Sequence, residues 1–255
     1  MEDRTPDFSV KSFLLPHMNP EGMKFVMGAF ALTCLVSVFF IPFVLPGLLL
    51  TYGIYLFFRD PERVPPLDEK LVVSPADGMV CMVAQVPLPE EIREKTAEEV
   101  KPEQLPDAGL PKVEVNLEAE PAVPENELVW RVSVFMSVLN VHVNRMPASG
   151  TIIKKVYVPG AFLNASLDKA SKDNERMVYL MRTECGKQLA FVQIAGLVAR
   201  RIVSFTDECR EMKRSERFGL IRFGSRVDVY LPQGVAPTVQ VGQIMVAGET
   251  PIASL

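Results

Sequence analysis

The sequence predicts an α+β protein that is mainly β, in which one compact β-rich domain follows an N-terminal hydrophobic helical membrane segment. Three observations predict this class. From residue 71 onward, short runs rich in valine and isoleucine recur between glycine, proline and aspartate. Phe25–Phe58 is a run of 34 residues without a charge. Strands do not alternate with long helices, which excludes a doubly wound sheet and the large folds that bind pyridoxal phosphate.

The uncharged run follows a tail of residues 1–24 and is predicted to enter a membrane. It is longer than the roughly 20 apolar residues that a spanning helix needs, and no small-residue cleavage site follows it, as a removable signal peptide would require. Pro42 and Pro46 divide it, so one kinked, tilted helix and a shallow re-entrant hairpin both fit. Cationic residues flank both ends, so the positive-inside rule selects no topology.

A second distinct segment, residues 87–128, is predicted to be a solvated insertion between two strands. It holds 12 acidic and 4 basic residues, and 7 of the 21 prolines of the chain. The formal net charge is -4 for the whole chain, so the remainder is mildly basic. A basic body beside a hydrophobic anchor suits an anionic bilayer surface.

The remaining elements are predicted from local pattern. Asp207–Arg217 is predicted to be a helix, because Thr206 can cap it, acidic residues open it, basic residues close it and Gly219 follows. Strands are predicted at Leu71–Val73, Met79–Val86, Leu128–Phe135, Gly150–Val158, Met177–Thr183, Gln188–Ile194, Arg226–Leu231 and Ile244–Ala247.

Composition excludes several functions. A negative net charge argues against a nucleic-acid binder. The four cysteines form no C-x-x-C pair, so neither a disulfide framework nor a zinc site is expected. With His17 and His142 as the only histidines, a multi-histidine metal site is not expected either, and no metal is predicted.

Three local features carry chemistry. His142 ends a strand pattern and has Asn140, Asn144 and Arg145 around it. Asp77 lies in the tight turn Ser74-Pro-Ala-Asp-Gly78, and Gly224-Ser225 is the one Gly-Ser pair in the chain. Each has a structural explanation: a core histidine, an aspartate bonding its own turn, and a bulge or hairpin.

The same three features also supply the parts of a nucleophilic site. A serine hydroxyl becomes a nucleophile when a base takes its proton, and a carboxylate can orient that base. An Asp-His-Ser hydrolase remains an alternative, although the chain has no G-x-S-x-G elbow. Glycine before Ser225 lets the backbone carbonyl be approached closely, which favours attack by Ser225 on its own preceding peptide bond.

These features, taken together and in order, resemble the phosphatidylserine decarboxylase proenzymes, in particular the short bacterial, pyruvoyl-dependent form. The resemblance covers nearly all of residues 71–255 outside the insertion, with Asn140 where many relatives carry aspartate. The matching stretches are Ser74-Pro-Ala-Asp-Gly78, Val141-His-Val-Asn-Arg145, Pro159-Gly-Ala-Phe162, Asn164-Ala165, Asp168-Lys-Ala-Ser171, Asn174-Glu-Arg176, Gln193–Arg201, Glu216-Arg-Phe-Gly219, Arg222-Phe-Gly-Ser-Arg226, Asp228, Tyr230, Pro232 and Gly248-Glu-Thr250.

The resemblance implies a zymogen that cuts itself between Gly224 and Ser225. His142 would be the base and Asp77 its orienting carboxylate. The products would be a β chain of residues 1–224 and an α chain of residues 225–255, associated as a heterodimer. Ser225 would become a covalent pyruvoyl group, so neither a metal nor pyridoxal phosphate is expected. Residues 59–255 would then be the decarboxylase domain.

The implied reaction converts phosphatidylserine to phosphatidylethanolamine and carbon dioxide in phospholipid biosynthesis. The expected partners are phosphatidylserine and membrane lipid at the cytoplasmic face of a bacterial cell membrane, with homo-oligomerisation left open. The basic residues Arg200, Arg201, Arg210, Lys213, Arg214 and Arg217 are candidates to meet lipid phosphates. The alternatives are a decarboxylase of a related serine phospholipid, such as an ether-linked archaeal one, or of a soluble amino acid, and a membrane-tethered β-domain that binds a partner without being cleaved.

Overall fold

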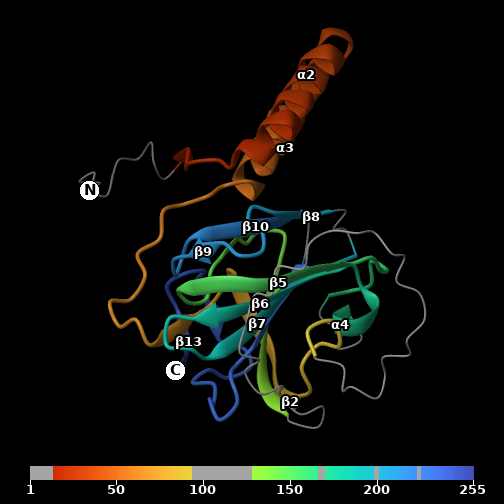
Figure 1. Cartoon of the computed structure of the whole chain (residues 1–255). Coiled ribbons are helices and arrows are strands. Elements are labelled where there is room, and N and C mark those ends of the chain that lie inside the picture. Colours follow the sequence, from red (N-terminus) through yellow and green to blue (C-terminus); the bar gives the residue numbers. More distant parts are fainter. Residues whose placement is uncertain (1–13, 94–127, 166–169, 198–200, 223–224) are drawn as a thin grey trace, which may run out of the picture.

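A helical hairpin projects from a curled β body (Figure 1). The computed structural model describes residues 14–93, 128–165, 170–197, 201–222 and 225–255. The hairpin begins with the short 3₁₀ turn η1 (Pro20–Gly22) and helix α2 (Met23–Phe39). A second 3₁₀ turn, η2 (Ile41–Phe43), contains Pro42 and reverses the chain into helix α3 (Val44–Phe57). The structure therefore has the hairpin and not one kinked helix.

Small residues bring the two helices of the hairpin together. The hydroxyls of Thr33 and Thr51 lie 3.5 Å apart, and a Cβ on Gly47 would lie 2.4 Å from the Thr33 side chain. Each threonine also donates to a carbonyl one turn earlier in its own helix, so the hydrogen of each hydroxyl is paired. The outward side chains are apolar and exposed, including Val38, Phe39 and Ile41. Of the described helices, Pro20–Phe39 alone is long and apolar enough to cross a membrane.

In the part of the chain that the structure describes, the β body contains three antiparallel sheets. The largest has eight strands in the order β12-β2-β3-β11-β7-β6-β5-β9, a second has the order β4-β10-β8, and β1 pairs with β13. The strands are β1 (Leu71–Val73), β2 (Gly78–Val86), β3 (Val129–Met136), β4 (Val143–Arg145), β5 (Gly150–Val158), β6 (Arg176–Thr183), β7 (Gln188–Ala195), β8 (Arg201–Ser204), β9 (Glu211–Met212), β10 (Arg217–Arg222), β11 (Ser225–Tyr230), β12 (Ile244–Met245) and β13 (Pro251–Ser254); one short helix, α4 (Ala170–Asp173), precedes β6.

Alternation along the strands places the main core on one face of the large sheet. Val227 and Val229 of β11 belong to this core, as do Phe218 and Ile221 of β10. Burial of such side chains is the main favourable term in folding. A separate cluster (Phe57, Phe58, Val141, Val143 and Leu220) fastens the base of the hairpin to strands β4 and β10.

The predicted fold class is confirmed, and so are the eight predicted strands, each to within two residues at either end. The predicted helix at residues 207–217 is wrong. Cys209 and Ser215 have φ of 61° and 66°, which a right-handed helix does not allow. Met212 pairs instead with Gly150 as part of β9. Most of the predicted insertion, residues 94–127, lies outside the described residues, as does the first part of the tail.

Candidate active site

Ser225 is the first residue of β11, in the middle of the large sheet. It pairs with Met136 at the end of β3 and with Ala195 at the end of β7. The side chain is fully buried, and its Oγ lies 4.0 Å from the Met136 sulfur. Sulfur is a weak acceptor, so this hydroxyl is held only loosely. Gly224, the other residue of the predicted cleavage site, lies outside the described residues.

His142 lies at the same end of the sheet as Ser225. Its carbonyl oxygen accepts a hydrogen bond from the Ile221 amide at 3.3 Å, and β10 then leads toward Ser225. The imidazole is fully buried, with the Phe57 ring 4.1 Å from it between centroids. Phe57 is the last residue of α3, so the hairpin itself covers the histidine.

The surroundings of His142 suit a proton acceptor. Burial lowers its pKa to about 4; the Asn140 hydrogen bond opposes this shift and the Arg59 charge adds to it. The ring is therefore neutral at pH 7. Its Nδ1 lies 2.9 Å from the Asn140 carbonyl oxygen. Because a carbonyl can only accept, Nδ1 carries the hydrogen and Nε2 presents the lone pair.

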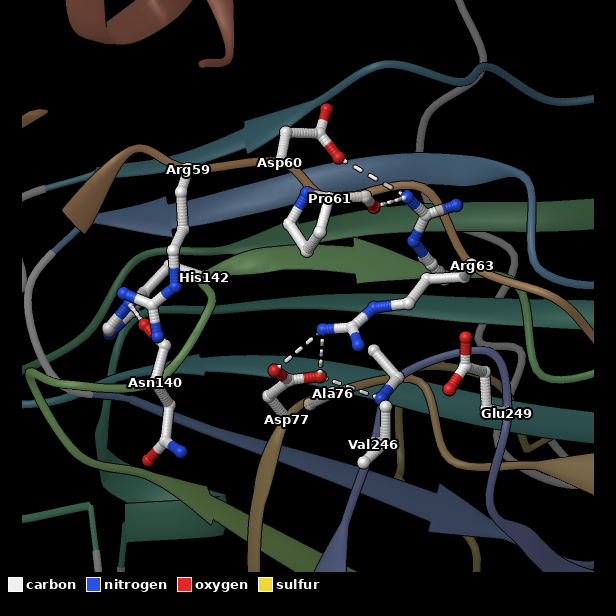
Figure 2. A network of polar contacts seen from close by, with 12 residues as sticks. Arg59, Asp60, Pro61, Arg63, Ala76, Asp77, Asn140, His142, Val246 and Glu249 are labelled. Carbon is white, nitrogen blue, oxygen red and sulfur yellow. Dashed lines mark hydrogen bonds and ion pairs between the residues drawn. The ribbon is translucent and has the colours of Figure 1, made fainter. Parts of the chain in front are cut away.

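Asp77 lies one residue before β2 and is held by two groups. One guanidinium nitrogen of Arg63 donates to both carboxylate oxygens, at 3.0 Å and 2.8 Å. The Ala247 amide donates to Oδ1 at 2.7 Å. Figure 2 shows Asp77 in one close view with His142 and Arg59, with no hydrogen bond drawn between Asp77 and His142. The position that the triad prediction gives to Asp77, on Nδ1, is taken by the Asn140 carbonyl.

Arg59 connects the two sides of this site electrostatically. It follows α3 directly and donates to the carbonyl oxygens of Leu56 and Leu139, at 2.8 Å and 2.5 Å. Burial lowers the pKa of Arg59, and the charge of Asp77 opposes that shift. Its charge in turn lowers the pKa of His142. The cation therefore interacts with both candidate residues.

A chain of buried polar side chains extends from Ser225 into the core. Asn144 lies 3.6 Å from the Met136 sulfur that Ser225 also meets, and it accepts from Gln193 at 2.8 Å. Gln193 accepts in turn from the Tyr179 hydroxyl at 3.0 Å. Burial raises the pKa of Tyr179. This network of uncharged side chains holds Asn144 in place beside Met136.

The structure thus places Ser225, His142 and Asp77 at one end of the large sheet. Sequence reasoning missed Arg63 and treated it only as a charge flanking the apolar run. The signal was present, since Arg59-Asp-Pro-Glu-Arg63 is a dense charge cluster immediately after that run.

The basic residues proposed to meet lipid phosphates are mostly used inside the protein. Arg217 binds Asp60 and Glu62, Arg214 donates to the carbonyl oxygens of Asp68 and Leu71, and Arg210 pairs with Glu216. Arg201 and Lys213 are exposed, and Arg200 lies outside the described residues.

The fold and the site define a class: a β-rich protein with a buried serine hydroxyl, a neutral imidazole and a clamped carboxylate gathered below an apolar hairpin. The model of the phosphatidylserine decarboxylase family matches residues 51–253. The chain is 49% identical over 246 residues to a phosphatidylserine decarboxylase proenzyme of Ruegeria pomeroyi, covering 96% of this chain and 97% of the relative.

Other relatives carry the same name. A proenzyme of the same name from Paramagnetospirillum magneticum is 48% identical over 249 residues, with 97% and 90% of the two chains covered. Another from Cereibacter sphaeroides is 45% identical over 246 residues, with 96% and 93% covered. The chain belongs to the phosphatidylserine decarboxylase family.

Proposed function

We propose that this chain is a self-processing decarboxylase that converts phosphatidylserine to phosphatidylethanolamine and carbon dioxide. The observation that carries the proposal is the buried, neutral His142 beside the strand that leads to the buried Ser225. The names of the relatives, proenzymes of this activity, support the substrate and the reaction.

In the self-processing step, Nε2 of His142 takes the proton of the Ser225 hydroxyl and Oγ attacks the carbonyl of Gly224. A C–O ester bond forms and the peptide C–N bond breaks, and the proton held by His142 passes to the departing nitrogen, which becomes the free amine of Ser225. Loss of the Cα proton then expels the Gly224 carboxylate and leaves a dehydroalanine terminus. Hydrolysis releases ammonia and gives a pyruvoyl group on residue 225. The two chains, 1–224 and 225–255, stay together as a heterodimer because β11 is paired on both sides.

The residues around Ser225 fit a pyruvoyl group. The position is fully buried and bordered by the Met136 sulfur and, beyond it, the Asn144 amide. Such a small, uncharged carbonyl group needs no counter-ion there. When formed, the group supplies a carbonyl that accepts electrons as carbon dioxide leaves the serine headgroup. His142 then acts a second time, because its Nε2 can hold a proton and return it at the reacting carbon.

The exposed apolar surface of the hairpin favours a substrate that resides in a bilayer. Its outer face is apolar and exposed over both helices, far beyond what a soluble surface normally carries. Pro20–Phe39 is long enough to cross a membrane, but α3, the returning helix of 14 residues, is about 21 Å long, less than the roughly 30 Å of a bilayer core. We therefore propose that the hairpin is re-entrant and holds the site at the cytoplasmic face of the cell membrane.

The test compares the wild type with Ser225→Ala in phospholipid vesicles. The wild type should run as two chains and release carbon dioxide from phosphatidylserine, while Ser225→Ala should stay whole and inactive. Turnover of an ether-linked archaeal serine phospholipid, but not of phosphatidylserine, would move the substrate to that class. An uncut wild-type chain without activity would make the protein a membrane-tethered binding domain.

A further inference from the structure

We infer that Arg63 is a positioning residue of the self-processing site: it fixes the orientation of the Asp77 carboxylate beside that site. This inference rests on the proposed function and adds a residue to its site. It makes the segment that leaves the membrane hairpin, residues 59–63, part of the catalytic apparatus.

The Arg63–Asp77 contact is a well-formed ion pair in a largely buried place. One nitrogen reaches both oxygens, and the side chains of the two residues are 13% and 14% exposed. An ion pair shielded from water in this way is screened less by salt than a surface pair. It therefore holds the carboxylate in one orientation.

The two carboxylate oxygens of Asp77 differ in how many hydrogen bonds they accept. Oδ1 accepts two hydrogen bonds, from Arg63 and from the Ala247 amide, whereas Oδ2 accepts one, from Arg63. A carboxylate oxygen has two lone-pair directions. In Figure 2, the oxygen without the amide contact is the one turned toward the side where Arg59 and His142 lie. In the proposed triad, this is the oxygen that would stabilise the imidazolium formed when His142 takes the serine proton.

Arg63 is itself anchored by the rest of the segment. Asp60 is buried, and it binds Arg145 at 3.2 Å and Arg217 at 2.7 Å. The Val64 amide donates to Glu249 at 2.9 Å, just after Arg63. Figure 2 shows the guanidinium reaching from this anchored segment down to Asp77. The segment thus connects the end of α3 to the carboxylate through fixed contacts.

The chain offers a matched control. Arg176 and Glu91 also form a partly buried ion pair, with side chains 14% and 16% exposed. Arg176→Gln therefore removes an ion pair of similar burial that does not involve Asp77. An effect of lost stability should appear in both Arg63→Gln and Arg176→Gln. An effect of lost Asp77 positioning should appear in Arg63→Gln alone.

The experiment measures the first-order rate of self-cleavage of the full-length chain after synthesis in the presence of phosphatidylserine vesicles. The variants are Arg63→Gln, Arg63→Lys, Arg176→Gln, Asp77→Asn and the double variant Arg63→Gln/Asp77→Asn. We expect Arg63→Gln to slow cleavage on the order of 10²-fold, as loss of orientation at a reacting group can do. Arg63→Lys should recover part of the rate, and Arg176→Gln should stay within about twofold of the wild type.

The double variant gives the decisive result. If Arg63 acts through Asp77, adding Arg63→Gln to the Asp77→Asn chain should slow cleavage no further. Wild-type kinetics in Arg63→Gln, or a double variant slowed by the product of the two single effects, would overturn the inference. Should Arg63→Gln fail to fold, the same comparison is made with Arg63→Lys. An uncut wild-type chain would instead refute the proposed self-processing itself.

Discussion

Replacing Phe57 by alanine should make self-cleavage sensitive to mild acid. Phe57 covers the His142 ring at 4.1 Å, and burial is the largest cause of the low histidine pKa, about 4. At pH 5.5 a base with that pKa is about 97% neutral, whereas a histidine with an ordinary pKa near 6.5 is about 9% neutral. The variant opens the ring to solvent, so its pKa should rise toward the ordinary value.

The quantity to compare is the rate of self-cleavage at pH 5.5 divided by the rate at pH 8. In the wild type, cleavage at pH 5.5 should proceed at nearly its pH 8 rate. In Phe57→Ala the same ratio should fall, by up to about tenfold if the pKa returns fully to 6.5. Tyr52→Ala is the control, because Tyr52 belongs to the same helix but its hydroxyl contacts the Leu14 carbonyl instead. Its ratio should match the wild type.

Stability must be separated from chemistry in this assay. The folded-state pKa of His142 lies below its unfolded value, so this residue's contribution to stability is complete above pH 6.5 and is lost as the pH falls toward 4. Rates are therefore divided by the folded fraction, measured by circular dichroism at each pH. A wild-type rate that halves near pH 6.5, or an unchanged ratio in Phe57→Ala, would refute the reasoning.

Three further predictions follow from the site. His142→Ala should slow self-cleavage by about 10²–10⁴-fold, because the general base is lost, and Asp77→Asn should also slow it. Both variants need a time course after synthesis, since a single turnover can finish slowly, and normal kinetics in His142→Ala would exclude His142 as the base. Hydride reduction with phosphatidylserine present should link the lipid to the 225–255 chain, and linkage to a lysine such as Lys172 would indicate a lysine-based enzyme. Deleting residues 1–58 should move the protein to the soluble fraction with residual self-cleavage that falls off at pH 5.5, because Phe57 leaves with the hairpin; a folded deletion variant that never cuts would show that the hairpin builds the site.

The sequence predicted a strand or helix correctly where a local pattern of residues is enough to determine it. Short runs of apolar and β-branched residues, such as Gly150–Val158 and Gln188–Ile194, predicted strands, and they form β5 and β7. The 34 uncharged residues indicated an apolar segment, but their pattern could not distinguish a kinked helix from a hairpin. That choice depends on the contact between Thr33 and Thr51, which are far apart in sequence.

Two features of the structure were not expected, and each has a physical cause. The residues at 207–217 have good helix capping and charge signals, yet strand pairing with β5 and the left-handed conformations of Cys209 and Ser215 override them. The role of Asp77 as the orienting carboxylate stays a prediction, and the structure adds a partner that was not expected: the Asn140 carbonyl oxygen lies 2.9 Å from Nδ1 of His142. Main-chain partners leave no mark on residue identity, so no sequence pattern could have revealed Asn140 in that role.

The intact mass of the purified protein is the sharpest test of the proposed self-processing. Two chains are expected, one ending at residue 224 and a small one of residues 225–255. The small chain should be lighter than the serine sequence requires, because a pyruvoyl group has replaced its terminal amine. Ser225→Ala should give a single mass for the whole 28.4 kDa chain. An uncut wild-type chain, or a small chain that begins with unmodified serine, would contradict the proposal.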